Sequence, residues 1–162
     1  MDGDHLRVAD PTIAAFREVL DESLEEIRRG IDDLSVDQLN ARPAGGDTNS
    51  IAVIVTHALG ATLSWLSLAM GAPLPPRDRD AEFRTVADEG FAARTDEMIA
   101  RCLAVLEAGK WVPDRVGTPN WSPRLAAEPR TAAWAAAHAL AHLGEHVGHL
   151  HMTRELFEPP TH

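Results

Sequence analysis

Cysteine is almost absent from this sequence: Cys102 is the one cysteine among 162 residues. A single cysteine excludes an internal disulfide and any thiolate zinc cluster built within one chain. The apolar neighbours of Cys102 in MIARCLAVLEA indicate a small buried side chain. Hydrophobic residues make up 44% of the chain, which is enough for one sizeable core. We therefore expect residues 1–162 to form a single domain.

Clusters of basic residues and long apolar runs are also absent. The net charge is −10 and the pI is about 5.1, and no stripe of Lys and Arg could neutralise phosphates. Nucleic acid is therefore not an expected partner. No run of about 18 or more apolar residues occurs, and the acidic segment MDGDHLRVADP lacks the apolar region of a signal peptide. These absences predict a soluble, cytoplasmic protein with no membrane partner.

The pattern that is present is helical, because no alternation typical of strands and no internal repeat occurs. Asp10, followed by proline, marks one helix start, and Asn49 or Ser50 can cap a second helix. Gly71 and Gly109 follow apolar periodic segments as stop signals. The expected helices span residues 11–34, 50–70, 80–108 and 131–156. Four long helices predict an all-α fold, a four-helix bundle.

The connections between these helices differ in composition. Residues 35–47 are rich in turn formers, and residues 73–76 contain three prolines, which cannot continue a helix. Residues 110–128 contain Trp111 and Trp121. A connection of this length and aromatic content is typical of a lid or a binding loop, so we expect it to cover a site.

Four histidines line one side of the last helix, in the run AAWAAAHALAHLGEHVGHLHMTREL: His138, His142, His146 and His149. At 100° per residue they fall within an arc of about 80°. Imidazole is the commonest metal ligand among side chains, and His142 and His146 have the i, i+4 spacing that holds one ion from two successive turns. Imidazolium ions so close together would repel one another, so we expect neutral rings that are ready to bind metal.

A catalytic zinc or nickel ion usually takes three protein ligands and keeps a further position open. Of the remaining histidines, His57 lies in a predicted core helix, and it can meet the pair if the second and fourth helices are neighbours. His138 and His149 are alternatives, as direct ligands or as hydrogen-bond donors behind the ligands. Glu145 lies about 20° beyond the stripe, where it can orient a ligand, act as a base or simply face solvent.

The segments NSIAVIVTHALGATLSWL and HLGEHVGHLHMTREL make the chain resemble the DinB-like superfamily of four-helix metalloproteins over nearly its whole length. The resemblance implies a divalent ion held by His57, His142 and His146. Gly148-His149 and Arg154-Glu155 look like the actinobacterial branch of the superfamily. The first residue of the pair is often glutamate in that branch, so His142 departs from it toward an all-histidine site.

Characterised members of the superfamily include S-transferases and isomerases that use bacillithiol, mycothiol or glutathione. The resemblance therefore implies a metal-dependent enzyme with a low-molecular-weight thiol cosubstrate, a small electrophilic substrate, and a zinc or nickel ion that activates thiol or water. It also implies a homodimer. Two alternatives stay open: a non-catalytic metal- or ligand-binding bundle whose histidines are structural or sensing, and an interaction module with an empty site.

Overall fold

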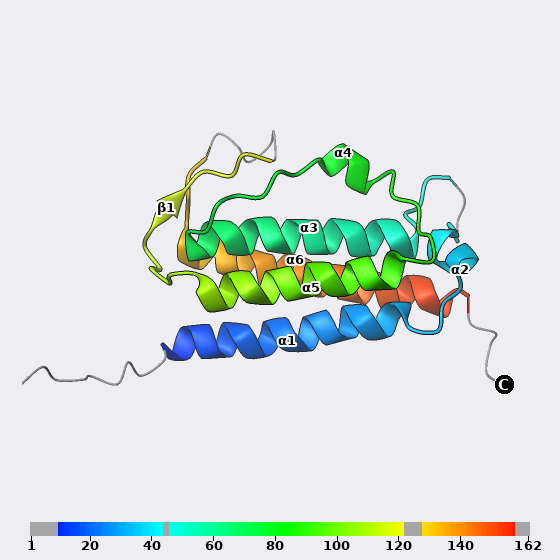
Figure 1. Cartoon of the computed structure of the whole chain (residues 1–162), viewed down its shortest axis with the longest axis horizontal. Coiled ribbons are helices and arrows are strands. Elements are labelled where there is room, and N and C mark those ends of the chain that lie inside the picture. Colours follow the sequence, from blue (N-terminus) through cyan, green and yellow to red (C-terminus); the bar gives the residue numbers. More distant parts are fainter. Residues whose placement is uncertain (1–9, 44–45, 122–127, 158–162) are drawn as a thin grey trace, which may run out of the picture.

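The computed structural model describes residues 10–43, 46–121 and 128–157, and four long helices dominate it (Figure 1). The long helices are α1 (Pro11–Ile31), α3 (Ile51–Met70), α5 (Phe91–Ala108) and α6 (Ala132–Glu155). Two short helices, α2 (Val36–Asn40) and α4 (Arg79–Glu82), lie in the connections. The strands β1 (Val116–Gly117) and β2 (Arg130–Thr131) form one short antiparallel pair. The prediction of an all-α four-helix bundle is confirmed.

The helix ends follow the capping chemistry of the sequence. The side chain of Asp10 accepts a hydrogen bond from the amide of Thr12, and the hydroxyl of Ser50 accepts one from the amide of Val53. Of the two predicted caps for α3, Ser50 is therefore the one used. Gly71 ends α3 at φ 65°, a left-handed conformation that glycine adopts without steric cost.

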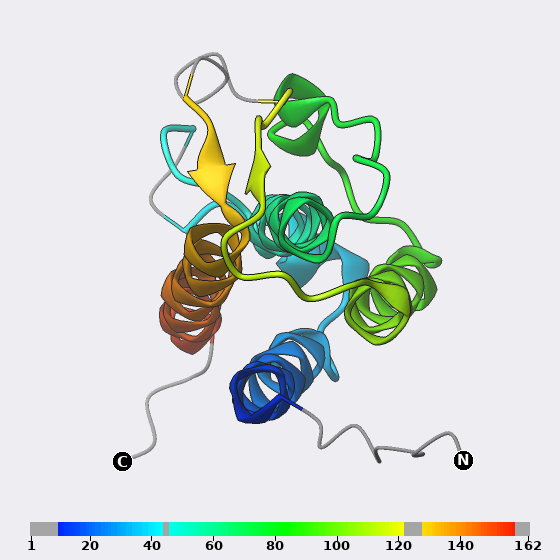
Figure 2. The same cartoon turned by 90° about the vertical axis from the view of Figure 1, so that its left-hand side faces the viewer.

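Helix α3 is the central element of the bundle. It packs against α5 and α6, while α1 closes the opposite side against the same two helices (Figure 2). Nearly all of its residues are buried, rather than those of one face alone. By length and composition α3 could cross a membrane, but 89% of its most apolar window is buried inside the molecule. Its hydrophobicity is therefore that of a core helix.

The prediction of one continuous helix over residues 80–108 is wrong. Helix α4 ends at Glu82, the chain turns through residues 83–90, and α5 begins at Phe91. Asn40 explains the break, because its side-chain amide donates to the carbonyl of Ala87 at 2.9 Å and accepts from the amide of Ala87 at 2.7 Å. Both backbone groups of Ala87 are thus withdrawn from helical hydrogen bonding.

Residues 72–90, which we call the strap, run back along the outer side of α3 and carry α4 (Figure 1). Three smaller elements were also not predicted. Helix α2 is a single turn with a capping box between Ser35 and Gln38, and β1 and β2 are too short to show any alternation. The strap matters most for function, since it brings α4 over the middle of α3.

Candidate metal centre

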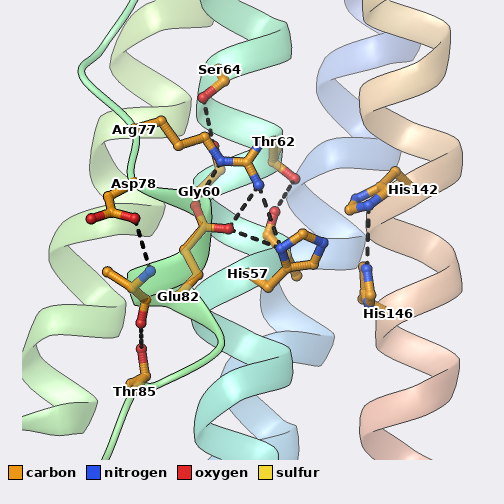
Figure 3. A network of polar contacts seen from close by, with 12 residues as sticks. His57, Gly60, Thr62, Ser64, Arg77, Asp78, Glu82, Thr85, His142 and His146 are labelled. Atoms are coloured by element: carbon orange, nitrogen blue, oxygen red, sulfur yellow. Dashed lines mark hydrogen bonds and ion pairs between the residues drawn. The ribbon is translucent and has the colours of Figure 1, made fainter. Parts of the chain in front are cut away.

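The side chains of His57, His142 and His146 lie together between α3 and α6 (Figure 3). One ring nitrogen of each can be chosen so that all three lie within 4.8 Å of one another. The Nε2 atoms of His142 and His146 are 3.3 Å apart, and the ring centroids of His57 and His146 are separated by 5.0 Å. The extensive packing of α3 on α6 makes this meeting possible, as the sequence analysis required.

His57 is held in place from the strap. Its Nδ1 lies 2.9 Å from Oε2 of Glu82, and Arg77 binds the same carboxylate through Nε at 2.6 Å and Nη2 at 2.8 Å. All three side chains are less than a tenth exposed. Burial alone would raise the pKa of Glu82, but the hydrogen bonds from Arg77 and His57 outweigh it and lower that pKa. Glu82 is therefore ionised and Nδ1 of His57 donates to it, while the other ring nitrogen, Nε2, lies toward His142 and His146 (Figure 3).

His142 and His146 are neutral at pH 7. Burial is the largest cause that lowers the pKa of His142, to about 3, with the neighbouring His146 and His57 adding to it. Burial and then His57 lower the pKa of His146 to about 4. Within the described part of the chain neither Nδ1 atom has a hydrogen-bond partner, although both are buried. His57 is thus the one ring of the three whose tautomer the protein fixes.

The donor set fits a divalent transition metal. Imidazole nitrogens bind zinc at about 2.0–2.1 Å, and two such ligands at the tetrahedral angle lie about 3.3 Å apart. This agrees with the 3.3 Å between Nε2 of His142 and Nε2 of His146. Three imidazole nitrogen donors without a thiolate suit zinc or nickel better than calcium or magnesium, which prefer oxygen.

The other three candidates lie along the same edge of α6 but do not join the cluster. His138 is half-buried, and its ring centroid is 5.9 Å from that of His142. His149 is exposed and stacks at 6.2 Å on His146, and Glu145 is exposed. Among the described residues, the group that can share one ion contains three ligands rather than four.

An aromatic wall, formed by Trp65, Trp121, Trp134 and His138, borders the cluster on the side of the α6 N-terminus. The ring of Trp65 contacts the other three, at centroid distances of 4.9, 5.4 and 4.8 Å respectively. The predicted covering loop therefore reaches this region through Trp121. Its other tryptophan, Trp111, packs instead on Phe16 of α1, and residues 122–127 lie outside the described residues.

Sequence reasoning missed Arg77 and Glu82. In PPRDRDAEF both look like ordinary charged residues beside a proline-rich turn, and Glu82 falls within the helix that was wrongly extended to residue 108. A buried histidine that binds metal through one ring nitrogen needs a hydrogen-bond acceptor at its other nitrogen, and this need was the available signal. That requirement predicts a carboxylate near His57, but it does not say which of the many acidic residues provides it.

Comparisons with known proteins agree with this architecture. The family model described as mycothiol-S-transferase matches residues 15–159. A search of curated proteins found no match. Among solved structures, the crystal structure of the conserved protein of locus from Enterococcus faecalis has a TM-score of 0.64 at 18% identity, over 88% of this chain and 95% of that chain, and thus shares the fold. Since the family model spans most of the sequence, the chain belongs to the mycothiol S-transferase family, a DinB-like family.

Proposed function

We propose that this protein is a divalent-metal-dependent S-transferase that joins a low-molecular-weight thiol, such as mycothiol, to a small electrophile. Zinc or nickel would be held by His57, His142 and His146. One observation carries the proposal: three imidazoles converge on a common point, and the two on α6 are neutral because burial lowers their pKa. Bound there, such an ion supplies Lewis-acid chemistry that lowers the pKa of a thiol or water.

The protein's own residues prepare the site. Glu82 and Arg77 fix the tautomer and ring plane of His57, so that Nε2 points toward α6 before any ligand arrives. The strap and α6 bury the rings and exclude water from most of their surface. This arrangement spares the ligands both reorientation and deprotonation when metal binds.

The aromatic wall supports a role in binding the electrophile. Trp134 is exposed by 39%; His138 stacks on its ring at 4.7 Å and the guanidinium of Arg130 also lies over the ring at 4.7 Å, so an apolar group can contact the exposed edge of Trp134 beside the cluster. Burial lowers the pKa of His138, which is therefore neutral at pH 7. A ring nitrogen of His138 can accept the thiol proton as the sulfur forms its bond to the electrophilic carbon and the carbon's bond to its leaving group breaks, bromide leaving in the case of monobromobimane.

A structural or sensing metal site is the second candidate function. Structural zinc usually has four protein ligands, and the cluster offers three, which favours an open position and therefore catalysis. A ring nitrogen of His138 or His149 would close the shell only after a change of side-chain conformation.

Metal analysis and a transfer assay test the proposal. Protein purified without an affinity tag should contain about one zinc or nickel ion per chain, and should join mycothiol to an electrophile such as monobromobimane. Bacillithiol and glutathione serve as comparison thiols. Bound metal with no transfer for any thiol would favour the structural site instead.

A further inference from the structure

A cavity lies beside the Glu82 and Arg77 pair, away from the three clustered histidines. It occupies about 440 Å³ between α3, the strap and α5. None of the three clustered histidines lines it, whereas Arg77 and Glu82 form part of its wall. A volume of this size is typical of small-molecule sites. The cavity is therefore separate from the metal centre and shares one wall with it.

The wall of this cavity is mainly apolar. Leu59 and Leu63 of α3 face Phe91 and Met98 of α5, and Pro75 closes part of the rim. Because these side chains come from three different elements, the space is a half-open pocket formed by the tertiary fold and is not a groove along a single helix. It can hold an apolar body of several carbon atoms.

Most of the polar groups in the wall are already engaged. The hydroxyls of Ser64, Thr85 and Thr95 each donate to the backbone carbonyl four residues earlier, at 2.8, 3.4 and 3.0 Å (Figure 3 shows the first two). Asp78 accepts from the amide of Ala81 as the cap of α4. Glu82 is bound to Arg77 and His57. A ligand rich in hydroxyl or amide groups would thus find few partners here.

The cations in the wall are not equivalent. Arg77 is bound to its buried carboxylate, and Arg94 pairs with Asp88 at 2.8 Å. Arg101 contacts the sulfur of Met98 at 3.3 Å and has no carboxylate partner among the described residues. One guanidinium beside an apolar space, without a counter-ion from the part of the chain that the structure describes, matches a carboxylate carried on an apolar chain or ring.

We propose that the cavity between α3, the strap and α5 binds a small amphipathic monocarboxylate, with its carboxylate on Arg101 and its apolar body between Leu59, Leu63 and Met98. The site is additional to the metal centre and does not depend on the proposed transfer reaction. Octanoate is a suitable probe, and octanol is the matched neutral probe of the same chain length.

Calorimetric titration of the protein tests whether Arg101 binds the carboxylate. Octanoate should bind the wild type. Arg101→Gln should lower the affinity for octanoate by about tenfold, the effect of losing one charge-assisted hydrogen bond. Arg94→Gln is the matched control, because it removes the same charge from the same cavity and should leave the affinity within about twofold. Octanol should bind Arg101→Gln and wild type equally. Equal octanoate affinities for the two arginine variants would overturn the assignment.

Two further variants locate the ligand. Met98→Trp fills the cavity and should abolish octanoate binding while circular dichroism stays that of the wild type. His146→Ala should bind octanoate normally, because that residue is absent from the wall. Retained binding in Met98→Trp, or lost binding in His146→Ala, would place octanoate elsewhere and overturn the proposal. Neither result bears on metal content or thiol transfer, which are measured separately.

Discussion

At the scale of single residues, the metal centre depends on neutral imidazoles and one anchored ring. We expect His146→Ala to lose metal and transfer activity together while keeping most of its helical content, because the core is built from aliphatic side chains. Metal analysis, circular dichroism and the transfer assay measure these effects. His151→Ala is the control, since His151 is on the same helix but pairs with Glu26 of α1. A His146→Ala variant that retained its metal would exclude this residue as a ligand.

Glu82 should act as a positioning residue. Glu82→Gln removes the charged acceptor of His57, so metal affinity should fall by about 10- to 100-fold. It also leaves Arg77 buried without its partner, which can cost about 3–5 kcal/mol of folding stability. The double variant Arg77→Met/Glu82→Gln should recover stability but not metal affinity, as measured by chemical unfolding and chelator competition. Recovery of both would show that Glu82 acts only on the fold.

Acid should destabilise the metal-free protein before the carboxylates titrate. The pKa values of His142 and His146 fall from an ordinary value of 6.5 to about 3 and about 4, chiefly through burial. The unfolded chain therefore binds more protons below pH 6.5, and stability is lost as the pH falls from 6.5 toward 4. Urea midpoints of chelator-treated protein at pH 7.5, 6 and 5 should decrease in that order. The decrease should be smaller in His142→Ala, and a flat profile in the wild type would contradict the neutral-ring assignment.

At the scale of elements, the strap makes the site by bringing α4 over α3. Asn40→Ala should loosen it, because both hydrogen bonds to Ala87 are lost, at a cost of about 1–3 kcal/mol. In the variant, hydrogen exchange of residues 83–90 should be faster than in the wild type, whereas exchange in α5 should change less. Metal affinity should fall less than in Glu82→Gln, since the carboxylate itself remains. Unchanged exchange in the strap would mean that α4 is held by other contacts.

The strap is the main part of the fold that the sequence did not predict. The four long helices were predictable, because their apolar periodicity and caps such as Asp10 and Ser50 are local signals. The histidine pair on α6 was predictable for the same reason, since i and i+4 always share a helix face. The break before α5 depends on Asn40, 47 residues away from Ala87, and the Glu82 contact depends on that break. Such long-range polar pairings leave no periodic trace in the sequence.

At the scale of the whole molecule, we expect a homodimer of two-fold symmetry. The outward side of α6 carries small exposed residues, Ala137, Ala141, Gly144 and Gly148, and a Cβ added at either glycine would meet no atom within 4 Å. A second copy can therefore approach this helix closely. Light scattering should give about twice the chain mass of 17.6 kDa. A single-chain mass at micromolar concentration would contradict the dimer.

Removing the metal should distinguish a catalytic from a structural ion. The aliphatic core of α1, α3, α5 and α6 is complete without the histidines, so chelated protein should remain folded at 25 °C. Metal that binds only the native state still stabilises it, by about 4 kcal/mol when free metal exceeds the dissociation constant a thousandfold. The melting temperature should thus rise steadily with added zinc or nickel. If chelated protein is instead unfolded at 25 °C, and the loaded protein transfers no thiol, the ion is structural and the helices require it to fold.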